Sequence, residues 1–240
     1  YKGIGDIEKI RRLRRFEEFG KSFQDYGNPI CWTNEDLSLA NVDAYMVGSD
    51  WVWNIDLKYP RYGYFGFVNT TKTFYSYAAS FGVNPNTVDK LRFVKKMAKN
   101  FKNLSIRESE GVNILHRLGF SEAHNDVDPT LLLQSSDWNS AIEFPEKSYN
   151  LVVYCLPSPN MDEFLNYISE FRARYPEYSV VILNPNRINL KGGDHRWDIG
   201  PQDFLGYIKT ANYIITNSFH ACVFCAMFNK QFTVFPRYSD

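Results

Sequence analysis

Asp50, Arg107 and His220 each follow a short apolar segment within four residues, and each carries a side chain that can do chemistry. A carboxylate can orient a base or accept a hydrogen bond from a sugar hydroxyl. A guanidinium can hold phosphate or carboxylate through two hydrogen bonds. An imidazole can bind an anion or transfer a proton near neutral pH. These side chains favour acid–base chemistry on an anionic substrate.

Each of the three residues also has a structural interpretation. His220 suits a hydrogen-bonded histidine in a domain interface, Asp50 suits an Asx turn or a helix cap, and Arg107 suits an ion pair with Glu108 or Glu110. Spacing alone leaves these alternatives open.

Ser218 stands at an N-cap position, directly after an apolar segment that ends at Thr216. The backbone N–H groups from Phe219 onward are then free of helical partners, and such a helix start attracts phosphate or carboxylate. His220 falls in this first turn. The sequence therefore predicts an anion-binding helix start that carries a histidine.

The first half of the chain must position Asp50 and Arg107. Helical spacing of apolar residues predicts helices near 7–19, 91–101 and 112–118, and apolar runs predict strands at 43–47, 73–78 and 104–106. The arginines in the opening helix are expected to form a solvated face; they are Arg11, Arg12, Arg14 and Arg15.

The second half repeats the alternation. We expect strands at 150–155, 180–183, 213–216 and 232–235, with helices near 164–171, 201–208 and 219–228. Strands that alternate with helices indicate parallel sheets, which bind ligands outside the carboxyl ends of their strands. The predicted domains are 1–135 and 149–240, joined by a linker at 136–148.

Composition limits the class of protein. The 240 residues include 27 Lys plus Arg and 27 Asp plus Glu, so net charge gives no reason to expect nucleic acid or an anionic membrane as a partner. Hydrophobic residues make up 44% of the chain, which is typical of a packed globular protein. We find no run of about 18 apolar residues and no signal peptide, which predicts a soluble, cytoplasmic protein without a transmembrane segment.

The four cysteines are too few for a disulfide framework and agree with a reducing compartment; they are Cys31, Cys155, Cys222 and Cys225. Cys222 and Cys225 form a C-x-x-C pair, but no second cysteine pair lies nearby and their neighbours are apolar. We therefore interpret both as small core residues and not as a zinc or redox site.

Residues 43–54 read DAYMVGSDWVWN, which resembles the signature D-x-x-x-V-G-S-D-x-V-W-N of the polysaccharide pyruvyl transferase family. Four further blocks resemble that family in the same order, at residues 77–82, 105–108, 127–132 and 199–220. The similarity runs from about Phe16 to Pro236.

The resemblance implies an α/β fold of two Rossmann-like domains like the glycosyltransferase B architecture, with the site in the cleft between them. It implies transfer of the pyruvyl group of phosphoenolpyruvate to two hydroxyls of a sugar residue in a cell-surface polysaccharide or exopolysaccharide. The product is a cyclic ketal, phosphate is released, and no cofactor or metal is expected.

Site residues follow from the same resemblance. Arg107 and His220 match family positions that contact the donor, and His220 and Asp50 are the expected catalytic pair. The remaining donor-binding candidates lie beside them in the matched blocks; they are Gly48, Ser49, Asn217 and Ser218.

The sequence departs from the family at both ends and inside the blocks. The family usually begins with a strand and a loop that this chain lacks, and it continues past Asp240, so we expect both ends to be truncated. Trp51 replaces a frequent glutamine, and Cys222 and Cys225 replace glycine or serine, which bears on acceptor choice. Two alternatives remain: a glycosyltransferase that uses a nucleotide sugar on the same fold, and a catalytically inactive carbohydrate-binding relative.

Overall fold

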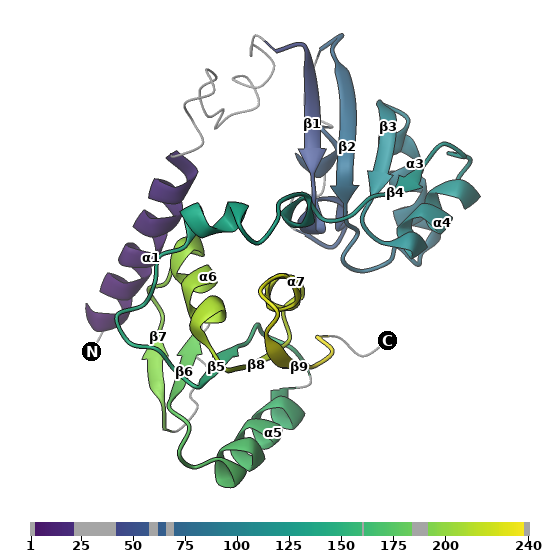
Figure 1. Ribbon diagram of the computed structural model, residues 1–240. Helices are drawn as coiled ribbons and strands as arrows, with labels where there is room; N and C mark the ends of the chain where they lie inside the picture. Colours follow the sequence, from purple (N-terminus) through teal and green to yellow (C-terminus); the bar gives the residue numbers. More distant parts are fainter. Residues whose placement is uncertain are drawn as a thin grey trace. The chain divides into compact units, whose positions relative to one another are not determined.

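The computed structural model describes residues 3–21, 42–57, 62–65, 70–159, 161–183 and 192–237 (Figure 1). The chain forms two compact units. The small unit is Asn28–Leu132, and the large unit combines Tyr1–Gly27 with Leu133–Asp240.

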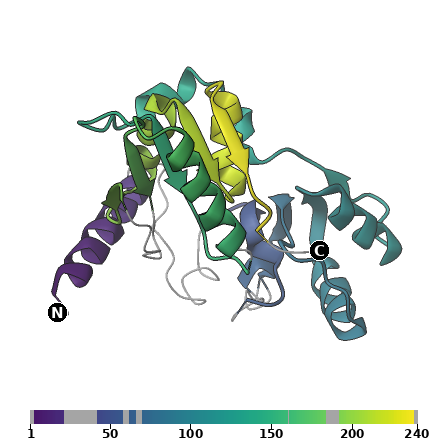
Figure 2. The ribbon, with the colours of Figure 1, turned by 90° about the horizontal axis from the view of Figure 1, so that it is seen from below.

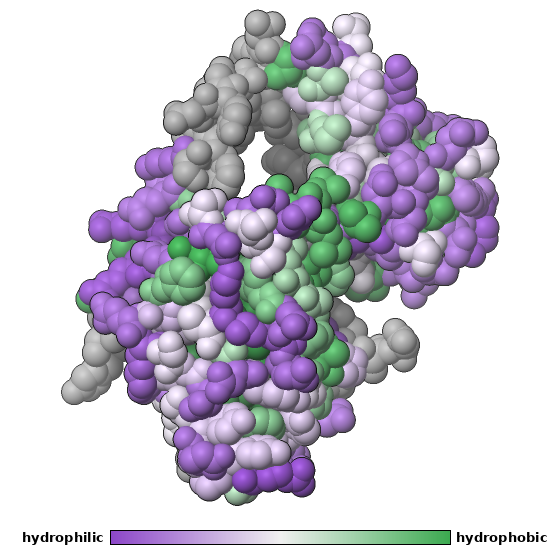
Figure 3. Space-filling model, in the orientation of Figure 1, coloured by the Kyte–Doolittle hydropathy of each residue, from purple (hydrophilic) through white to green (hydrophobic). Residues whose placement is uncertain are grey.

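The small unit contains a parallel sheet in the order β1-β2-β3-β4. Its strands are β1 (Ala44–Gly48), β2 (Thr73–Ala79), β3 (Phe101–Ile106) and β4 (His124–Asn125), and its crossover helices are α3 (Val88–Ala98) and α4 (Ser109–Arg117). Crossovers between parallel strands are right-handed, so strands added in one direction place α3 and α4 on the same face of the sheet. The surface of this unit that Figure 3 shows around α4 is mostly hydrophilic.

An aromatic core fills the space under α3 and α4. Trp53 and Tyr64 are fully buried and their rings stack with centroids 4.7 Å apart. They come from two short 3₁₀ helices, Asp50–Trp53 and Tyr62–Tyr64. The Trp53 indole N–H donates to the Gly63 carbonyl at 2.8 Å, which satisfies its buried polar atom. This packing fixes the segment that directly follows Asp50.

The large unit contains a parallel sheet in the order β7-β6-β5-β8-β9. The strands are β5 (Leu151–Tyr154), β6 (Val180–Leu183), β7 (Asp194–Arg196), β8 (Tyr213–Thr216) and β9 (Gln231–Val234). From β5 the chain adds strands on one side, then returns to add β8 and β9 on the other. The strand order therefore reverses between β5 and β8, and ligands bind at such a switch point in open α/β sheets.

Helices cover both faces of this sheet. Helix α5 (Met161–Arg174) lies on one face, and α6 (Pro201–Thr210) and α7 (Phe219–Met227) lie on the other (Figures 1 and 2). Alternate strand residues face opposite sides, so Val152 packs with α6 and α7 while Val153 packs with α5. Both faces are apolar, which explains the near-continuous hydrophobic runs of β5, β6 and β8.

Helix α1 (Gly3–Lys21) belongs to the large unit, which differs from the predicted domain 1–135. Arg15 forms an ion pair with Asp203 of α6. A Cβ at Gly200 would come within 2.7 Å of the Arg15 Cβ, so glycine allows this close approach. Arg11 and Arg14 are exposed, as predicted for a solvated face, whereas Arg12 and Arg15 are half-buried.

The predicted linker 136–148 also differs from expectation, because it packs within the large unit. The Trp138 ring contacts the Phe224 ring at 5.1 Å, and the Glu143 N–H donates to the Gln202 carbonyl at 3.2 Å.

The predicted α/β class with two parallel sheets is confirmed, and each predicted strand and helix has a counterpart. The arrangement of a glycosyltransferase B fold stays a prediction. None of the described helices is long and apolar enough to cross a membrane.

Candidate functional site

The carboxyl ends of β1, β2 and β3 meet at one edge of the small unit. The Ser49 N–H donates to the Tyr77 carbonyl at 3.1 Å, and the Arg107 N–H donates to the Ala79 carbonyl at 3.0 Å. The register of β2 against β3 shifts between Ser76 and Ala79, where Ala78 has a φ of 46°. Such a bulge redirects the chain next to functional residues. Since β1 ends at Gly48 and β3 at Ile106, the predicted residues Gly48, Ser49, Asp50 and Arg107 lie at this edge.

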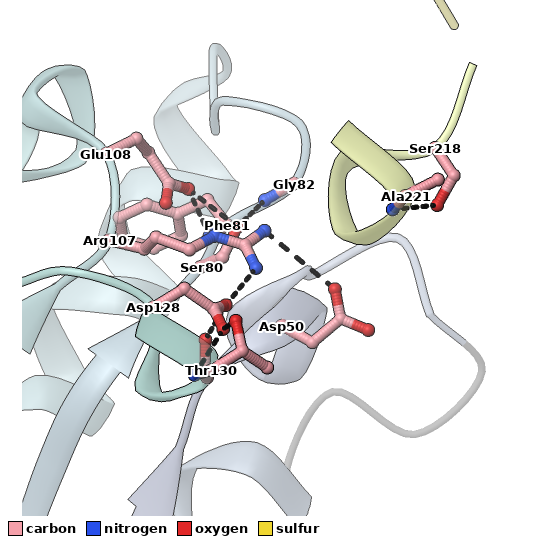
Figure 4. A network of polar contacts seen from close by, with 11 residues as sticks. Asp50, Ser80, Phe81, Gly82, Arg107, Glu108, Asp128, Thr130, Ser218 and Ala221 are labelled. Atoms are coloured by element: carbon pink, nitrogen blue, oxygen red, sulfur yellow. Dashed lines mark hydrogen bonds and ion pairs between the residues drawn. The ribbon is translucent and has the colours of Figure 1, made fainter. Parts of the chain in front are cut away.

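Asp128 organises that edge through four hydrogen bonds (Figure 4). Its Oδ2 accepts from Arg107 Nη1 at 2.9 Å and from Ser49 Oγ at 2.7 Å. Its Oδ1 accepts from the Thr130 N–H at 3.1 Å and from Thr130 Oγ1 at 2.7 Å. The Asp128 side chain is 1% exposed and that of Arg107 is 12% exposed. This buried, fully bonded pair fixes one edge of the guanidinium and leaves the other edge toward Asp50.

Asp50 points its carboxylate toward Arg107 Nη2, with 3.8 Å between the atoms (Figure 4). Its side chain is 66% exposed, and it has no other ion pair or hydrogen bond to a described side chain. The backbone φ of 55° is left-handed, where aspartate is more frequent than most residues. The Asx-turn and cap alternatives therefore lack support, and Asp50 presents an accessible carboxylate.

The predicted structural partners of Arg107 are wrong. Glu108 instead accepts hydrogen bonds from Ser80 Oγ at 2.9 Å and from the Phe81 N–H at 2.7 Å (Figure 4). Glu110 forms an ion pair with Arg117. Arg107 pairs instead with Asp128 and Asp50, and local sequence did not indicate Asp128 because 21 residues separate it from Arg107.

Gly48 and Ser49 have different surroundings. A Cβ at Gly48 would meet only the Tyr77 carbonyl oxygen at 3.9 Å, an ordinary contact, so packing does not require glycine there. Ser49 uses its hydroxyl to bind Asp128. Their roles toward a donor stay predictions.

The second group of predicted residues follows β8 in the large unit. Ser218 is the N-cap of α7 and its Oγ accepts from the Ala221 N–H at 3.4 Å (Figure 4). Asn217 Oδ1 accepts from the Leu156 N–H, and its Nδ2 donates to the Leu156 carbonyl, both at 2.8 Å. These bonds join the ends of β8 and β5 across the switch point and hold the start of α7 in place.

His220 lies in the first turn of α7 and lines a cavity of about 320 Å³ within the large unit. Tyr154, Phe204 and Arg12 are also in its wall. Tyr154 ends β5 and His220 follows β8, so the cavity lies at the switch point. Its wall combines aromatic faces, a guanidinium and the N-terminal turn of a helix.

This edge of the large unit carries positive charge. Burial raises the pKa of Tyr154, while the charges of Arg12 and Arg237 act to lower it. Arg12 lines the same cavity as Tyr154, and Arg237 Nε donates to the Pro157 carbonyl just after β5, so two guanidinium groups lie at this edge. With the positive end of the α7 dipole, they favour an anion in this region. The sequence pattern had indicated the helix start and missed Arg12 as a lining residue.

The cysteines of α7 are free thiols. Burial raises the pKa of Cys225 to about 12 and also raises that of Cys222, so both stay protonated at neutral pH. Cys225 is buried in the core of the large unit, as interpreted, whereas Cys222 is half-buried and not part of that core. Cys31 lies outside the described residues. Within the described ranges no group of three or more His, Cys, Asp or Glu could hold a metal ion. The absence of a metal or cofactor from the reaction stays a prediction.

The model of a family described as polysaccharide pyruvyl transferase matches residues 3–239 of the chain, nearly its whole length. No curated protein sequence matches it significantly.

Proposed function

This chain belongs to the polysaccharide pyruvyl transferase family, and we propose that it transfers the pyruvyl group of phosphoenolpyruvate to two hydroxyls of one sugar residue. The products are a cyclic ketal and phosphate. The observation that supports this reaction best is His220, which lies in the first turn of α7 on the switch-point cavity.

Each unit, taken by itself, carries positive groups that suit the anionic donor. The N-terminal turn of α7, with Ser218 as its cap, and Arg12 suit the phosphate of the donor. Arg107 has one edge fixed by Asp128, and its Nη2 faces the exposed Asp50, where it suits a carboxylate oxygen of the donor. Asp128 positions Arg107 and does not itself touch the donor. Since phosphoenolpyruvate is a cytoplasmic metabolite, we place the reaction in the cytoplasm.

Chemistry begins with proton transfer from the His220 imidazolium to the methylene carbon of phosphoenolpyruvate. The adjacent carbon becomes electrophilic and a sugar hydroxyl adds to it, while Asp50 accepts the hydroxyl proton. The carbon–oxygen bond to phosphate then breaks, and the second hydroxyl adds at the same carbon. Its proton leaves with the phosphate, Asp50 releases its proton to water, and His220 takes up a proton from water. Two hydroxyl protons thus account for the new methyl hydrogen and the protonated phosphate.

The test compares His220→Ala with His124→Ala. His124 is an exposed histidine paired with Asp126, so it controls for loss of an imidazole. Phosphate release from phosphoenolpyruvate is measured with a panel of free and lipid-linked saccharides. Loss of a general acid lowers the rate by roughly 100- to 10,000-fold. An active and folded His220→Ala variant would refute the role of His220.

A thermal-shift titration separates this function from nucleotide-sugar transfer on a similar fold. We expect phosphoenolpyruvate to raise the melting temperature and nucleotide sugars to leave it unchanged. The reverse result would reject pyruvyl transfer. Saccharide binding without phosphate release from any acceptor would indicate a carbohydrate-binding relative.

A further inference from the structure

A second cavity, of about 300 Å³, opens between the end of α5 and the start of β8. We call it the α5 pocket. It includes Phe171 and Tyr175 at the end of the helix, Tyr178 before β6 and Tyr213 at the start of β8. It therefore lies at the amino edge of the large sheet, whereas His220 follows the carboxyl end of β8. The two cavities share no lining residue.

Aromatic rings form a rigid wall in the α5 pocket. The Phe171 ring stacks on the Tyr213 ring with centroids 5.1 Å apart, and it contacts the Tyr175 and Tyr178 rings at 4.8 and 5.8 Å. The Tyr213 hydroxyl is 2.7 Å from Thr233 Oγ1, so that ring is held from β9. A pre-organised wall of this kind loses little entropy when a ligand binds.

Polar groups surround the aromatic wall. Glu170 and Arg174 line the pocket from the last turns of α5, and both are exposed. Neither side chain forms an ion pair or hydrogen bond with another side chain in the described part of the chain, and the same holds for the hydroxyls of Tyr175 and Tyr178. Tyr175 is 37% exposed. The pocket thus offers a carboxylate acceptor, a guanidinium donor and two phenol hydroxyls around an apolar face.

We propose that the α5 pocket binds an uncharged sugar residue of the saccharide acceptor, away from the residue that is modified. This inference rests on the saccharide acceptor of the proposed function. A pyranose has apolar C–H faces that pack on aromatic rings, and equatorial hydroxyls that need both donors and acceptors. One acidic and one basic group give no net charge, which disfavours a phosphate or an anionic lipid surface.

The position of the α5 pocket relative to the His220 cavity indicates which acceptors it would favour. The α5 pocket and the His220 cavity lie at opposite ends of β8, whose four residues span about 13 Å at roughly 3.3 Å per residue, and on opposite faces of the sheet. An acceptor that reaches both must therefore be several residues long. A saccharide of several residues can occupy a site beyond the reaction centre, and a second contact raises the effective concentration of its reactive end. The pocket therefore favours oligomeric acceptors over single sugars.

The experiment measures binding to the full chain by saturation-transfer NMR and calorimetry, without phosphoenolpyruvate. The probes are uncharged pentasaccharides of glucose, galactose and mannose, each with α or β linkages. We expect at least one to bind. Tyr175→Ala should weaken its binding about fivefold through loss of ring contact. Glu170→Gln should weaken it about tenfold through loss of a charge-assisted hydrogen bond.

Two variants serve as matched controls. Glu163→Gln removes an exposed carboxylate from the same helix outside the pocket and should bind as the unmodified chain does. Tyr175→Phe keeps the ring and removes only the hydroxyl, so it should weaken binding less than Tyr175→Ala. Because Glu170 is an exposed helix residue, Glu170→Gln tests the proposal even if a tyrosine variant folds poorly.

Three outcomes would overturn the proposal: no pentasaccharide binds, the Tyr175 and Glu170 variants bind normally, or Tyr175→Ala changes self-association in place of saccharide binding. Repeating the titration with His220→Ala separates the two proposals. Saccharide binding should persist in that variant. If the unmodified chain binds a saccharide but releases no phosphate from phosphoenolpyruvate with any acceptor, the proposed reaction is rejected and the α5 pocket is kept. If pyruvyl transfer occurs and the pocket variants do not change saccharide binding, the proposed reaction is kept and the α5 pocket is rejected.

Discussion

Replacing Asp128 should destabilise the carboxyl edge of the small unit. Its side chain is 1% exposed and accepts four hydrogen bonds, two from Thr130 and one each from Arg107 and Ser49. Removing one partner of a buried ion pair costs about 3–5 kcal/mol, because the other charge stays buried without compensation. Asp50, at 3.8 Å from Arg107, compensates in part, so we expect about 3 kcal/mol for Asp128→Ala.

Asp128→Asn separates charge from shape. An asparagine keeps an oxygen for Thr130 but presents an amide where Arg107 and Ser49 donate, so about 2 kcal/mol should be lost. The matched control is Asp89→Asn, which breaks the exposed pair with Arg92 and should cost less than about 0.5 kcal/mol.

Hydrogen exchange detected by mass spectrometry provides the assay, because it measures the opening free energy of β1 and β3 separately from the large unit. Arg107→Met combined with Asp128→Asn should cost less than the sum of the single changes, since no buried charge is left. If Asp128→Ala opened β3 no more readily than the Asp89 control does, the pair would not hold this edge together.

Three further predictions concern the site and the core. Asp50→Asn should lower the rate of pyruvyl transfer by roughly 100- to 10,000-fold through loss of the base. Its melting temperature should not change, because the side chain is 66% exposed and asparagine tolerates positive φ. An unchanged rate would reject Asp50 as the base. Arg12→Ala should raise the KM for phosphoenolpyruvate about tenfold, while the exposed neighbour Arg11 gives an inert control; equal effects would contradict a specific contact. Burial raises the pKa of Cys155 and Cys225 from 9.0 to about 12. The folded state therefore keeps each thiol neutral where the unfolded state ionises it. This contribution to stability is complete below pH 9 and is lost as the pH rises toward 12. The free energy of unfolding in urea should then fall by about 1.4 kcal/mol per pH unit for each thiol, less steeply in Cys225→Ala, and identical slopes would refute the assignment.

The fold could be predicted where burial leaves a strong pattern. Strands β5, β6 and β8 are buried on both faces and read as apolar runs, so the predicted residues 150–155, 180–183 and 213–216 match them closely. Strands β4 and β7 are short edge strands with polar sequences, and no hydrophobic period identifies them. Their position depends on the sheet they join.

The site was predictable in its positions and not in its partners. Parallel sheets bind ligands at the carboxyl ends of their strands. The local sequence after each predicted strand therefore indicated Arg107 and His220. The bonds of Arg107 to Asp128, and of Asn217 to Leu156, join residues 21 and 61 positions apart, which only the sheet order brings together. Local sequence also did not indicate that α1 belongs to the large unit, because its Arg15 pairs with Asp203 near the other end of the chain.

Transfer of labelled carbon tests the central claim most directly. Phosphoenolpyruvate labelled with ¹³C at the phosphate-bearing carbon is incubated with the chain and the saccharide panel, and the saccharides are isolated for NMR. Pyruvyl transfer predicts the label at a quaternary ketal carbon attached to a methyl group, with one phosphate released per label and no transfer by His220→Ala. Label found only in free pyruvate or unreacted donor, across all acceptors, would contradict it.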